Sequence, residues 1–479
     1  MNNFFVGRTE EKKILLKALN AHQGELVAVL GRRRVGKTYL IRSTYKERIG
    51  FEMTGVQESS LKEQLQNFTN RLNFHVRPTI PFQRPTSWLE AFNMLMLHFN
   101  SQDLKEKVVI FLDEFPWIAT RRSGFLKAFG VFWNTWASQN NVVVVICGSA
   151  ASWMIQKVVR DKGGLHNRIT RRIHLEPFNL AETKSYFDGQ HFNFNHYQTI
   201  QLYMALGGIP HYLKEVEGGQ SAAENIDRIF FSKSGFLKEE FALLYPALFE
   251  NAELHIKIIR LLAEKWQGLS RKEMVLLGKL PNGGGLTKVI EELEHSGFIS
   301  PFYTFGKKKT GIRYRLMDEY SIFYLKFIEN KRLEEKGMWN KLSQTQTYKI
   351  WSGYAFENIC LRHIAQVKKA LNLDAIYSET STYRSVNSEK TKATQIDILI
   401  DRNDQVINLL ELKFYNKDFV MTKSYAKELR DKMTIFQENT KTHKQLFWSL
   451  MTTFGMEHNE HSRGLISNVL TMDVLFDGE

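Results

Sequence analysis

The stretch at residues 31–38 constrains the fold of this chain more than any other feature. It follows a short apolar run at residues 25–30 and precedes a segment whose apolar residues have helical spacing. A loop with this spacing of glycines wraps a phosphate with successive backbone N–H groups, in dihedral angles that a side chain would obstruct. A chance match in a turn rich in Gly and Arg would need neither the strand before it nor the helix after it. The loop consists of Gly31, Arg32, Arg33, Arg34, Val35, Gly36, Lys37 and Thr38.

Two side chains at the end of this loop suit nucleotide chemistry. In loops of the form G-x-x-x-x-G-K-[ST], the lysine reaches the β- and γ-phosphates and the hydroxyl binds Mg²⁺. We therefore expect Lys37 to hold the phosphates of ATP and Thr38 to be a ligand of the Mg²⁺ ion. The strand, loop and helix together predict an α/β fold with a P-loop ATPase core built on a parallel sheet.

A second apolar run, at residues 107–112, ends in two carboxylates, Asp113 and Glu114. A strand of this kind downstream of a phosphate loop is typical of a Walker B motif. Asp113 is predicted to hold Mg²⁺ through water, and Glu114 to polarise the water that attacks the γ-phosphate. The alternative is a strand that merely ends in acidic loop residues.

A third apolar run, at residues 141–148, is followed by Ser149. Some P-loop ATPases have an extra central strand between the two Walker strands, and the polar tip of that strand senses the γ-phosphate. Ser149 is the predicted sensor. A serine at this point is equally suited to cap a helix predicted at residues 150–159.

Composition limits the class of protein. A chain of 479 residues corresponds to about two to four domains. The net charge of +14 favours a polyanionic partner such as DNA, although many basic proteins bind no nucleic acid. The longest apolar run is too short to span a bilayer, and the N-terminus does not resemble a signal peptide. We therefore expect a cytoplasmic protein that does not enter a membrane.

Short motifs in order along the chain resemble an ATPase family. They are similar to archaeal and bacterial P-loop ATPases of the AAA+-related, STAND-like branch, which are often fused to a C-terminal nuclease-like domain. The resemblance implies an ATPase domain at residues 1–245, with a helical lid at about 180–245. The motifs, quoted as they stand here, are Phe5-Val6-Gly7-Arg8, the loop at 31–38, Leu112-Asp113-Glu114, Cys147-Gly148-Ser149, Asn167-Arg168 and Gly207-Gly208-Ile209-Pro210.

The same resemblance implies roles for two further residues. Arg168 would contact the γ-phosphate, and Pro210, in the lid, would pack near the base. From the residues alone, Arg168 could equally be a surface cation, and the Gly-Gly-Ile-Pro stretch could simply break a helix.

Residues 246–330 are predicted to form a winged helix. Three helical segments, at 252–266, from 270 and at 285–295, precede two strand-like runs at 298–305 and 312–316. The loop between the runs carries Lys307, Lys308 and Lys309, which suit contact with DNA phosphates. The acids of the third helix would repel phosphate, so a rigid spacer or a protein contact is the alternative.

After a polar linker at 331–346, residues 347–479 contain a predicted β-hairpin, residues 395–401 and 406–413. Alternation along a strand puts Glu411 and Lys413 on one face, where Asp397 of the partner strand can approach them. Carboxylates suit Mg²⁺, and a nearby lysine can orient or deprotonate the attacking water.

This hairpin, preceded by a helix that bears Glu357, resembles the PD-(D/E)XK nuclease core, an α/β restriction-endonuclease-like fold. The resemblance implies that Asp397 and Glu411 bind Mg²⁺ or Mn²⁺, that Lys413 is the catalytic lysine and that Glu357 is an accessory acid. Ile396 stands where the motif has proline. The alternatives are a cross-strand ion pair on an exposed hairpin and a nuclease fold that has lost activity.

Two functions from different classes follow. The first is an ATPase that regulates a metal-dependent DNA endonuclease. The second is an ATP-dependent, STAND-like switch whose nuclease-like domain is inactive and binds nucleic acid or a protein. The sequence leaves open whether the chain forms a homo-oligomer or has another protein partner. A helicase-like motor is disfavoured because no second motor core is evident.

Overall fold

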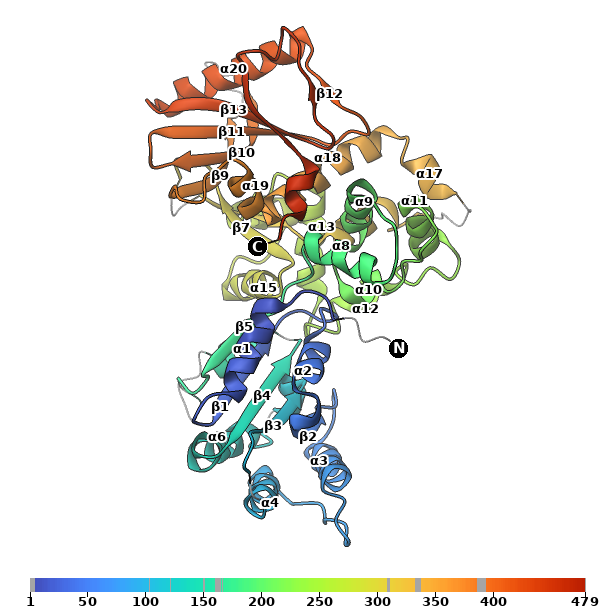
Figure 1. Cartoon of the computed structure of the whole chain (residues 1–479), viewed down its shortest axis with the longest axis vertical. Coiled ribbons are helices and arrows are strands. Elements are labelled where there is room, and N and C mark those ends of the chain that lie inside the picture. Colours follow the sequence, from blue (N-terminus) through green and yellow to red (C-terminus); the bar gives the residue numbers. More distant parts are fainter. Residues whose placement is uncertain are drawn as a thin grey trace. The chain divides into compact units, whose positions relative to one another are not determined.

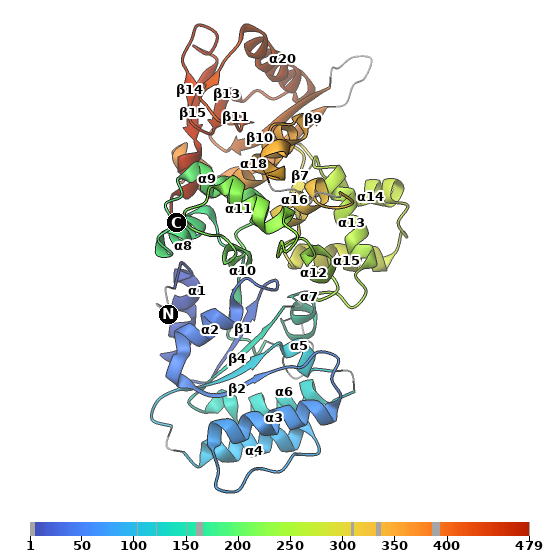
Figure 2. The same ribbon diagram turned by 90° about the vertical axis from the view of Figure 1, so that its right-hand side faces the viewer.

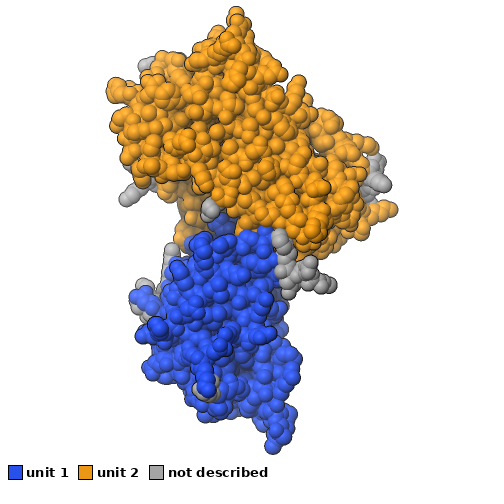
Figure 3. All heavy atoms as spheres, viewed as in Figure 1, with its two compact units in different colours: residues 1–177, 248–250, 295–297 blue, residues 178–247, 251–294, 298–479 orange. Residues whose placement is uncertain are grey.

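The computed structural model describes residues 5–102, 104–120, 122–149, 151–159, 165, 167–307, 311–331, 337–385 and 393–478. Its residues divide into two compact units (Figure 3). Unit 1 comprises residues 1–177, 248–250 and 295–297, and unit 2 comprises residues 178–247, 251–294 and 298–479. Lys308 and Lys309, predicted to contact DNA, lie outside the described residues.

The core of unit 1 is a five-stranded sheet in the order β2-β3-β4-β1-β5, with all neighbours parallel (Figure 1). The predicted extra strand, β4, lies between β1 and β3. Strands β1 and β4 are buried along their whole length, as expected for parallel strands covered on both faces. The strands are β1 (Glu25–Leu30), β2 (Ile49–Thr54), β3 (Val108–Asp113), β4 (Val142–Gly148) and β5 (Arg171–His174).

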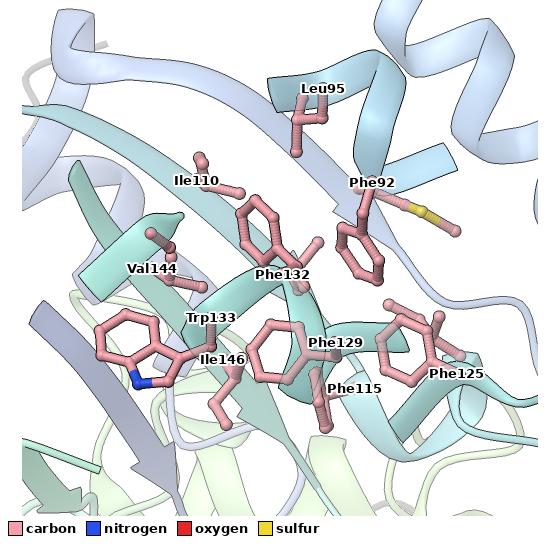
Figure 4. Close-up of a cluster of buried hydrophobic side chains, with 14 of the residues drawn as sticks. Phe92, Leu95, Ile110, Phe115, Phe125, Phe129, Phe132, Trp133, Val144 and Ile146 are labelled. Atoms are coloured by element: carbon pink, nitrogen blue, oxygen red, sulfur yellow. The ribbon is translucent and has the colours of Figure 1, made fainter. Parts of the chain in front are cut away.

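Helices pack against this sheet, and α3, α4 and α6 form one group (Figure 2). Between this group and the sheet lies a core rich in aromatic side chains, in which Phe92, Phe129 and Phe132 meet Ile110 and Val144 (Figure 4). This core fixes the carboxyl ends of β3 and β4, where the predicted site residues lie. The helices are α1 (Thr9–Leu19), α2 (Lys37–Tyr45), α3 (Leu61–Val76), α4 (Trp88–Asn100), α5 (Phe115–Ile118), α6 (Phe125–Thr135) and α7 (Ala151–Met154).

Unit 2 begins with helices where the lid was predicted. They are α8 (Leu180–Gly189), α9 (His196–Leu206), α10 (Pro210–Leu213), α11 (Ala222–Ile226) and α12 (Glu240–Leu244). The sequence grouped residues 180–245 with the ATPase domain, whereas the compact units separate after residue 177. The domain boundaries therefore stay a prediction.

The three helices and the hairpin predicted for residues 246–330 are present. A capping box formed by Ser270 and Glu273 opens the second helix. A short strand before it joins the hairpin in a sheet ordered β6-β8-β7. The elements are α13 (Glu253–Glu264), β6 (Leu269–Ser270), α14 (Arg271–Gly278), α15 (Gly284–His295), β7 (Ile299–Tyr303), β8 (Ile312–Leu316) and, after the sheet, α16 (Glu319–Phe327) and α17 (Met338–Leu342).

The C-terminal part of unit 2 is a five-stranded mixed sheet in the order β15-β13-β11-β10-β9. The predicted hairpin is β10 and β11, which pair antiparallel, while β11, β13 and β15 are parallel. The elements are α18 (Gln346–Arg362), α19 (Ile364–Ala370), β9 (Ser378–Ser385), β10 (Thr394–Arg402), β11 (Val406–Lys413), β12 (Phe419–Val420), α20 (Lys423–Thr440), β13 (Gln445–Thr452), β14 (Met456–Glu457) and β15 (Ile466–Thr471). Within the described part of the chain, no helix has both the length and the apolar composition that a bilayer span requires.

Candidate functional site

The loop at residues 31–36 depends on its two glycines for different reasons. Gly31 has φ 148°, and a Cβ there would lie 2.3 Å from the carbonyl oxygen of Leu175. Gly36 has φ 95° and stands at the N-terminus of α2. Any other residue at these positions would clash or be strained. The loop backbone is therefore fixed at the end of β1.

Lys37 is folded back onto this loop. Its Nζ donates hydrogen bonds to the carbonyl oxygens of Gly31 and Arg32, each at 2.9 Å, and the residue is only 6% exposed. Burial lowers the pKa of Lys37, and the charges of Glu114 and Asp113 oppose that shift. An ammonium has three donors, so one remains for an anionic ligand beyond the two loop carbonyls.

Asp113, at the end of β3, joins three segments of unit 1. Its Oδ2 accepts a hydrogen bond from Thr38 Oγ1 at 2.9 Å. Its Oδ1 accepts from Cys147 Sγ at 2.7 Å and from the backbone N–H of Glu114 at 2.9 Å. The two predicted Mg²⁺ ligands are thus in direct contact. The sequence assigned Cys147 no role, although it stands in the Cys147-Gly148-Ser149 motif that contributes to the resemblance.

Glu114 and Ser149 form a second contact at the same end of the sheet. The backbone N–H and the hydroxyl of Ser149 donate to Glu114 Oε2 at 3.1 and 2.9 Å. Glu114 has φ 46°, which is uncommon for a residue with a side chain and is often found at functional sites. Ser149 as a helix cap stays open, because residue 150 is outside the described residues.

The other predicted nucleotide residues are less closely associated. Val35 is buried, and the charge of Arg33 contributes to lowering the pKa of Lys37. Arg168 is exposed, and its backbone N–H donates to Leu165 O at 3.1 Å. Pro210 is the first residue of α10 in unit 2, so its predicted proximity to the base stays a prediction.

A second cluster surrounds Glu411 on β11. Its buried carboxylate accepts from Lys413 Nζ and Lys432 Nζ, each with a contact at 3.1 Å. The Tyr425 hydroxyl donates to its Oε1 at 2.5 Å. Burial alone would raise the pKa of Glu411, but the charges of Lys413 and Lys432 bring it below its ordinary value. Tyr425 and Lys432 lie on α20 at a spacing of seven, which puts them on one helix face.

Asp397 lies beside this carboxylate. The β10–β11 register pairs Ile398 with Leu410, so Asp397 and Glu411 are the next facing pair. Asp397 Oδ2 accepts from the backbone N–H of Leu412 at 3.0 Å. Burial, followed by the charges of Glu411 and Glu357, raises the pKa of Asp397 well above its ordinary value. Among the described residues, no cation forms an ion pair with Asp397.

Glu357, on α18, has a partner that the sequence did not predict. Arg315 on β8 forms an ion pair with it, Nη1 to Oε1, at 2.8 Å. Both side chains are buried. Since α18 packs against β11, with the Phe356 and Phe414 ring centroids 5.4 Å apart, Glu357 lies near the hairpin cluster, but it has a cation of its own. In the described ranges, no group of three or more His, Cys, Asp or Glu side chains is arranged to hold a metal ion.

Residues 5–216 match the model of a family described as an ATPase domain predominantly from Archaea. This region is an archaeal-type P-loop ATPase domain. The match contains the whole phosphate loop, Asp113, Glu114 and Ser149, and extends into unit 2 as far as α10.

One relative extends the likeness beyond residues 5–216. The chain is 25% identical over 424 residues to "Uncharacterized protein MJECL04" of Methanocaldococcus jannaschii, covering 88% of this chain and 90% of the relative. Among solved structures, the Walker-type ATPase paby2304 of Pyrococcus abyssi is 16% identical with a TM-score of 0.48, over 67% of this chain and 96% of that one. The ORC2 protein of Aeropyrum pernix is 15% identical with a TM-score of 0.40, over 68% of this chain and 95% of that one.

Proposed function

We propose that this chain is a Mg²⁺-dependent ATP hydrolase whose nucleotide state regulates a C-terminal, metal-dependent DNA endonuclease. The observation that carries the first half is the hydrogen-bonded set Thr38, Asp113, Glu114 and Ser149 beside Lys37. The observation that carries the second half is Asp397, a half-buried carboxylate that forms no ion pair within the described part of the chain, facing Glu411 and Lys413.

The residues of the ATPase domain suit Mg·ATP. Lys37 would bind the β- and γ-phosphates with its remaining donor, and Thr38 and Asp113 offer the oxygen ligands that Mg²⁺ prefers. Glu114 would orient the attacking water, and Ser149 would sense the γ-phosphate. Arg168, being exposed, is available to contact a γ-phosphate in its own chain or in a second copy, and Pro210 would pack near the base.

The C-terminal cluster suits a divalent cation. A carboxylate that is partly withdrawn from water is costly without a counter-charge, and the raised pKa of the half-buried Asp397 reflects that cost. Mg²⁺ or Mn²⁺ held by Asp397 and Glu411 would supply this charge and polarise a phosphodiester. Lys413 would orient the attacking water, and Glu357 would be the accessory acid.

DNA is the proposed substrate because of the net charge of +14. We assign the winged-helix segment, residues 246–330, a structural contact with the C-terminal domain of the same chain rather than DNA binding. Its β7 end is tied to β9 through a bridge between Thr304 and Thr382, and Phe305 N donates to Thr382 O at 2.9 Å. These contacts, all within unit 2, join β7 to the C-terminal sheet.

A switch without nuclease activity is the second candidate. It is favoured by the cations that already neutralise Glu411 and Glu357, namely Lys413, Lys432 and Arg315. In that function, ATP occupancy would change domain packing or oligomeric state, and the C-terminal domain would bind DNA or a protein.

Cleavage of supercoiled plasmid separates the two candidates. The full chain is assayed with Mg²⁺ or Mn²⁺, with and without ATP, beside Asp397→Asn, which keeps the shape of the side chain and removes its charge. We expect cleavage that Asp397→Asn abolishes and that ATP alters. Absence of cleavage under every condition, with ATP still bound, would refute the nuclease and favour the switch.

A further inference from the structure

Arg315 is not an ordinary surface cation. It lies on β8 of the winged-helix segment, and its guanidinium is 5.1 Å from the ring centroid of Phe302 on the neighbouring strand. Its side chain is 7% exposed and that of Glu357 is 6% exposed. Among the residues that the structure describes, Arg315 Nε has no hydrogen-bond partner. The charge is therefore buried between an aromatic ring and one carboxylate, and Glu357 is its counter-charge.

Contacts on both sides of the Arg315–Glu357 ion pair hold the winged-helix segment against α18. Next to Arg315 in β8, the carbonyl oxygen of Leu316 accepts a hydrogen bond from Asn358 Nδ2 at 3.0 Å, and Asn358 follows Glu357 in α18. One turn earlier in α18, Tyr354 stacks on Trp266 with ring centroids 3.8 Å apart. The winged-helix segment thus contacts α18 on both sides of Glu357. A movement of β8 would therefore move Glu357 or break its ion pair with Arg315.

Three carboxylates of the cluster have different partners. Glu411 is bound by Lys413 and Lys432, and Glu357 by Arg315. Within the described ranges, the hydrogen-bond partner of the Asp397 carboxylate is the backbone N–H of Leu412. Glu357 is nevertheless close to the hairpin, because α18 packs against β11 and Phe356, beside Glu357, contacts Phe414, beside Lys413, with ring centroids 5.4 Å apart. Glu357 is therefore close to the proposed metal position but is held by a competing cation.

We propose that Arg315 is a positioning residue of the metal site, and that it withholds Glu357 from the ligand set of Asp397 and Glu411. This role rests on the proposed metal-dependent function. A guanidinium and a divalent cation compete for the same carboxylate oxygens, and their like charges repel each other. The position of β8 thereby controls whether the divalent cation is bound by Asp397 and Glu411 alone or by Glu357 as well.

The test is Mn²⁺ binding to the full chain, measured by calorimetry or by the electron paramagnetic resonance of free Mn²⁺. Arg315→Met is expected to bind Mn²⁺ about tenfold more tightly than the wild type, at the low end of the effect of second-sphere partners on metal sites. Adding Glu357→Gln to Arg315→Met should return the affinity to the wild-type level, because the released acid is then absent.

Two controls limit the interpretation. Arg313→Met removes the nearby arginine of β8 that pairs with Glu273 at 3.0 Å, and it should leave Mn²⁺ affinity unchanged. Arg315→Lys keeps a charge beside Glu357 and should retain the wild-type affinity. Should Arg315→Met fail to fold, Arg315→Gln replaces it with the same expectation.

The outcomes separate the two claims. Unchanged or weaker Mn²⁺ binding in Arg315→Met, with binding lost in Asp397→Asn, would overturn the role of Arg315 and leave the metal site standing. The absence of Mn²⁺ binding in the wild type and in Arg315→Met alike would overturn the metal site, and the role of Arg315 with it.

Discussion

Ser149 donates two hydrogen bonds to one carboxylate oxygen of Glu114, at 3.1 Å from its backbone N–H and at 2.9 Å from its hydroxyl. The residue predicted to sense the γ-phosphate therefore touches the residue predicted to orient water. A phosphate oxygen that accepted the Ser149 hydroxyl would take one of these two bonds from Glu114. Sensing and activation of water would then be one event.

Ser149→Ala should lower kcat for ATP hydrolysis about tenfold, as expected when one hydrogen bond to a charged group is lost. ATP affinity should stay unchanged, because the backbone N–H of residue 149 remains. Steady-state ATPase assays with a separate nucleotide-binding measurement test this split. Glu114→Gln is the matched variant, with kcat reduced by about 100-fold or more and binding retained. A wild-type kcat in Ser149→Ala would argue against the coupling.

Lys37→Ala should abolish ATP binding, because the buried ammonium is the cation that points into the loop. Fluorescence titration with a labelled ATP analogue measures the affinity. Lys13→Ala is the control, since Lys13 is exposed and pairs with Glu10 on α1, away from the loop. Full retention of ATP affinity by Lys37→Ala would refute the assignment of this loop.

Cys147→Ala should raise the Mg²⁺ concentration needed for half-maximal ATPase activity several-fold. Its thiol orients Asp113 Oδ1 at 2.7 Å, and burial raises the pKa of Cys147 well above its ordinary value, so the donor keeps its proton. Cys147→Ser should preserve the Mg²⁺ requirement because a hydroxyl donates in the same way. The buried Cys360 provides the control, and Cys360→Ala should leave the requirement unchanged. An identical requirement in Cys147→Ala would show that Thr38 and the Glu114 N–H suffice.

The order of the strands around the phosphate loop was easier to predict from the sequence than the side-chain contacts at the site were. Runs such as Val142–Gly148 are apolar along their whole length, and only a central strand of a parallel sheet buries both faces in this way. The hairpin of Asp397 and Glu411 was predictable because two strand-like runs, residues 395–401 and 406–413, are separated by a short polar segment. These features depend on neighbours in sequence.

Cys147 and Arg315 were not predictable for a physical reason. Each acts through a residue on a different element, so its role exists only once two segments have packed together. Asp113 and Cys147 are 34 residues apart, and Arg315 and Glu357 are 42 apart. Arg315 also sits in a strand that reads as a polar, half-exposed run, and nothing in that pattern indicates that its guanidinium is buried. Lys432 and Tyr425 were predictable in part. Their spacing of seven on α20 indicates that they share a helix face, but not that this face contacts Glu411.

His363 should make the stability of unit 2 depend on pH. Its Nε2 accepts from the backbone N–H of Leu180 at 3.0 Å, and its Nδ1 donates to Ile359 O at 2.8 Å, so the ring is held neutral. Burial, with a smaller contribution from Arg362, lowers the pKa of His363 to about 4, below the value of about 6.5 in an unfolded chain.

Because this pKa is depressed on folding, the unfolded chain takes up the proton first as the pH falls. The contribution of His363 to the free energy of unfolding is therefore fully present above about pH 6.5 and is lost progressively towards pH 4. At pH 5 the loss amounts to about 2 kcal/mol. Urea unfolding of the full chain at pH 7.5 and pH 5 measures the change. His363→Gln keeps a hydrogen-bonding side chain without a titratable ring and should reduce the difference by this amount. His22→Gln is the control: His22 lies in unit 1 and His363 in unit 2, so this variant should leave the pH difference unchanged. An equal pH dependence in wild type and His363→Gln would assign the acid sensitivity to other groups.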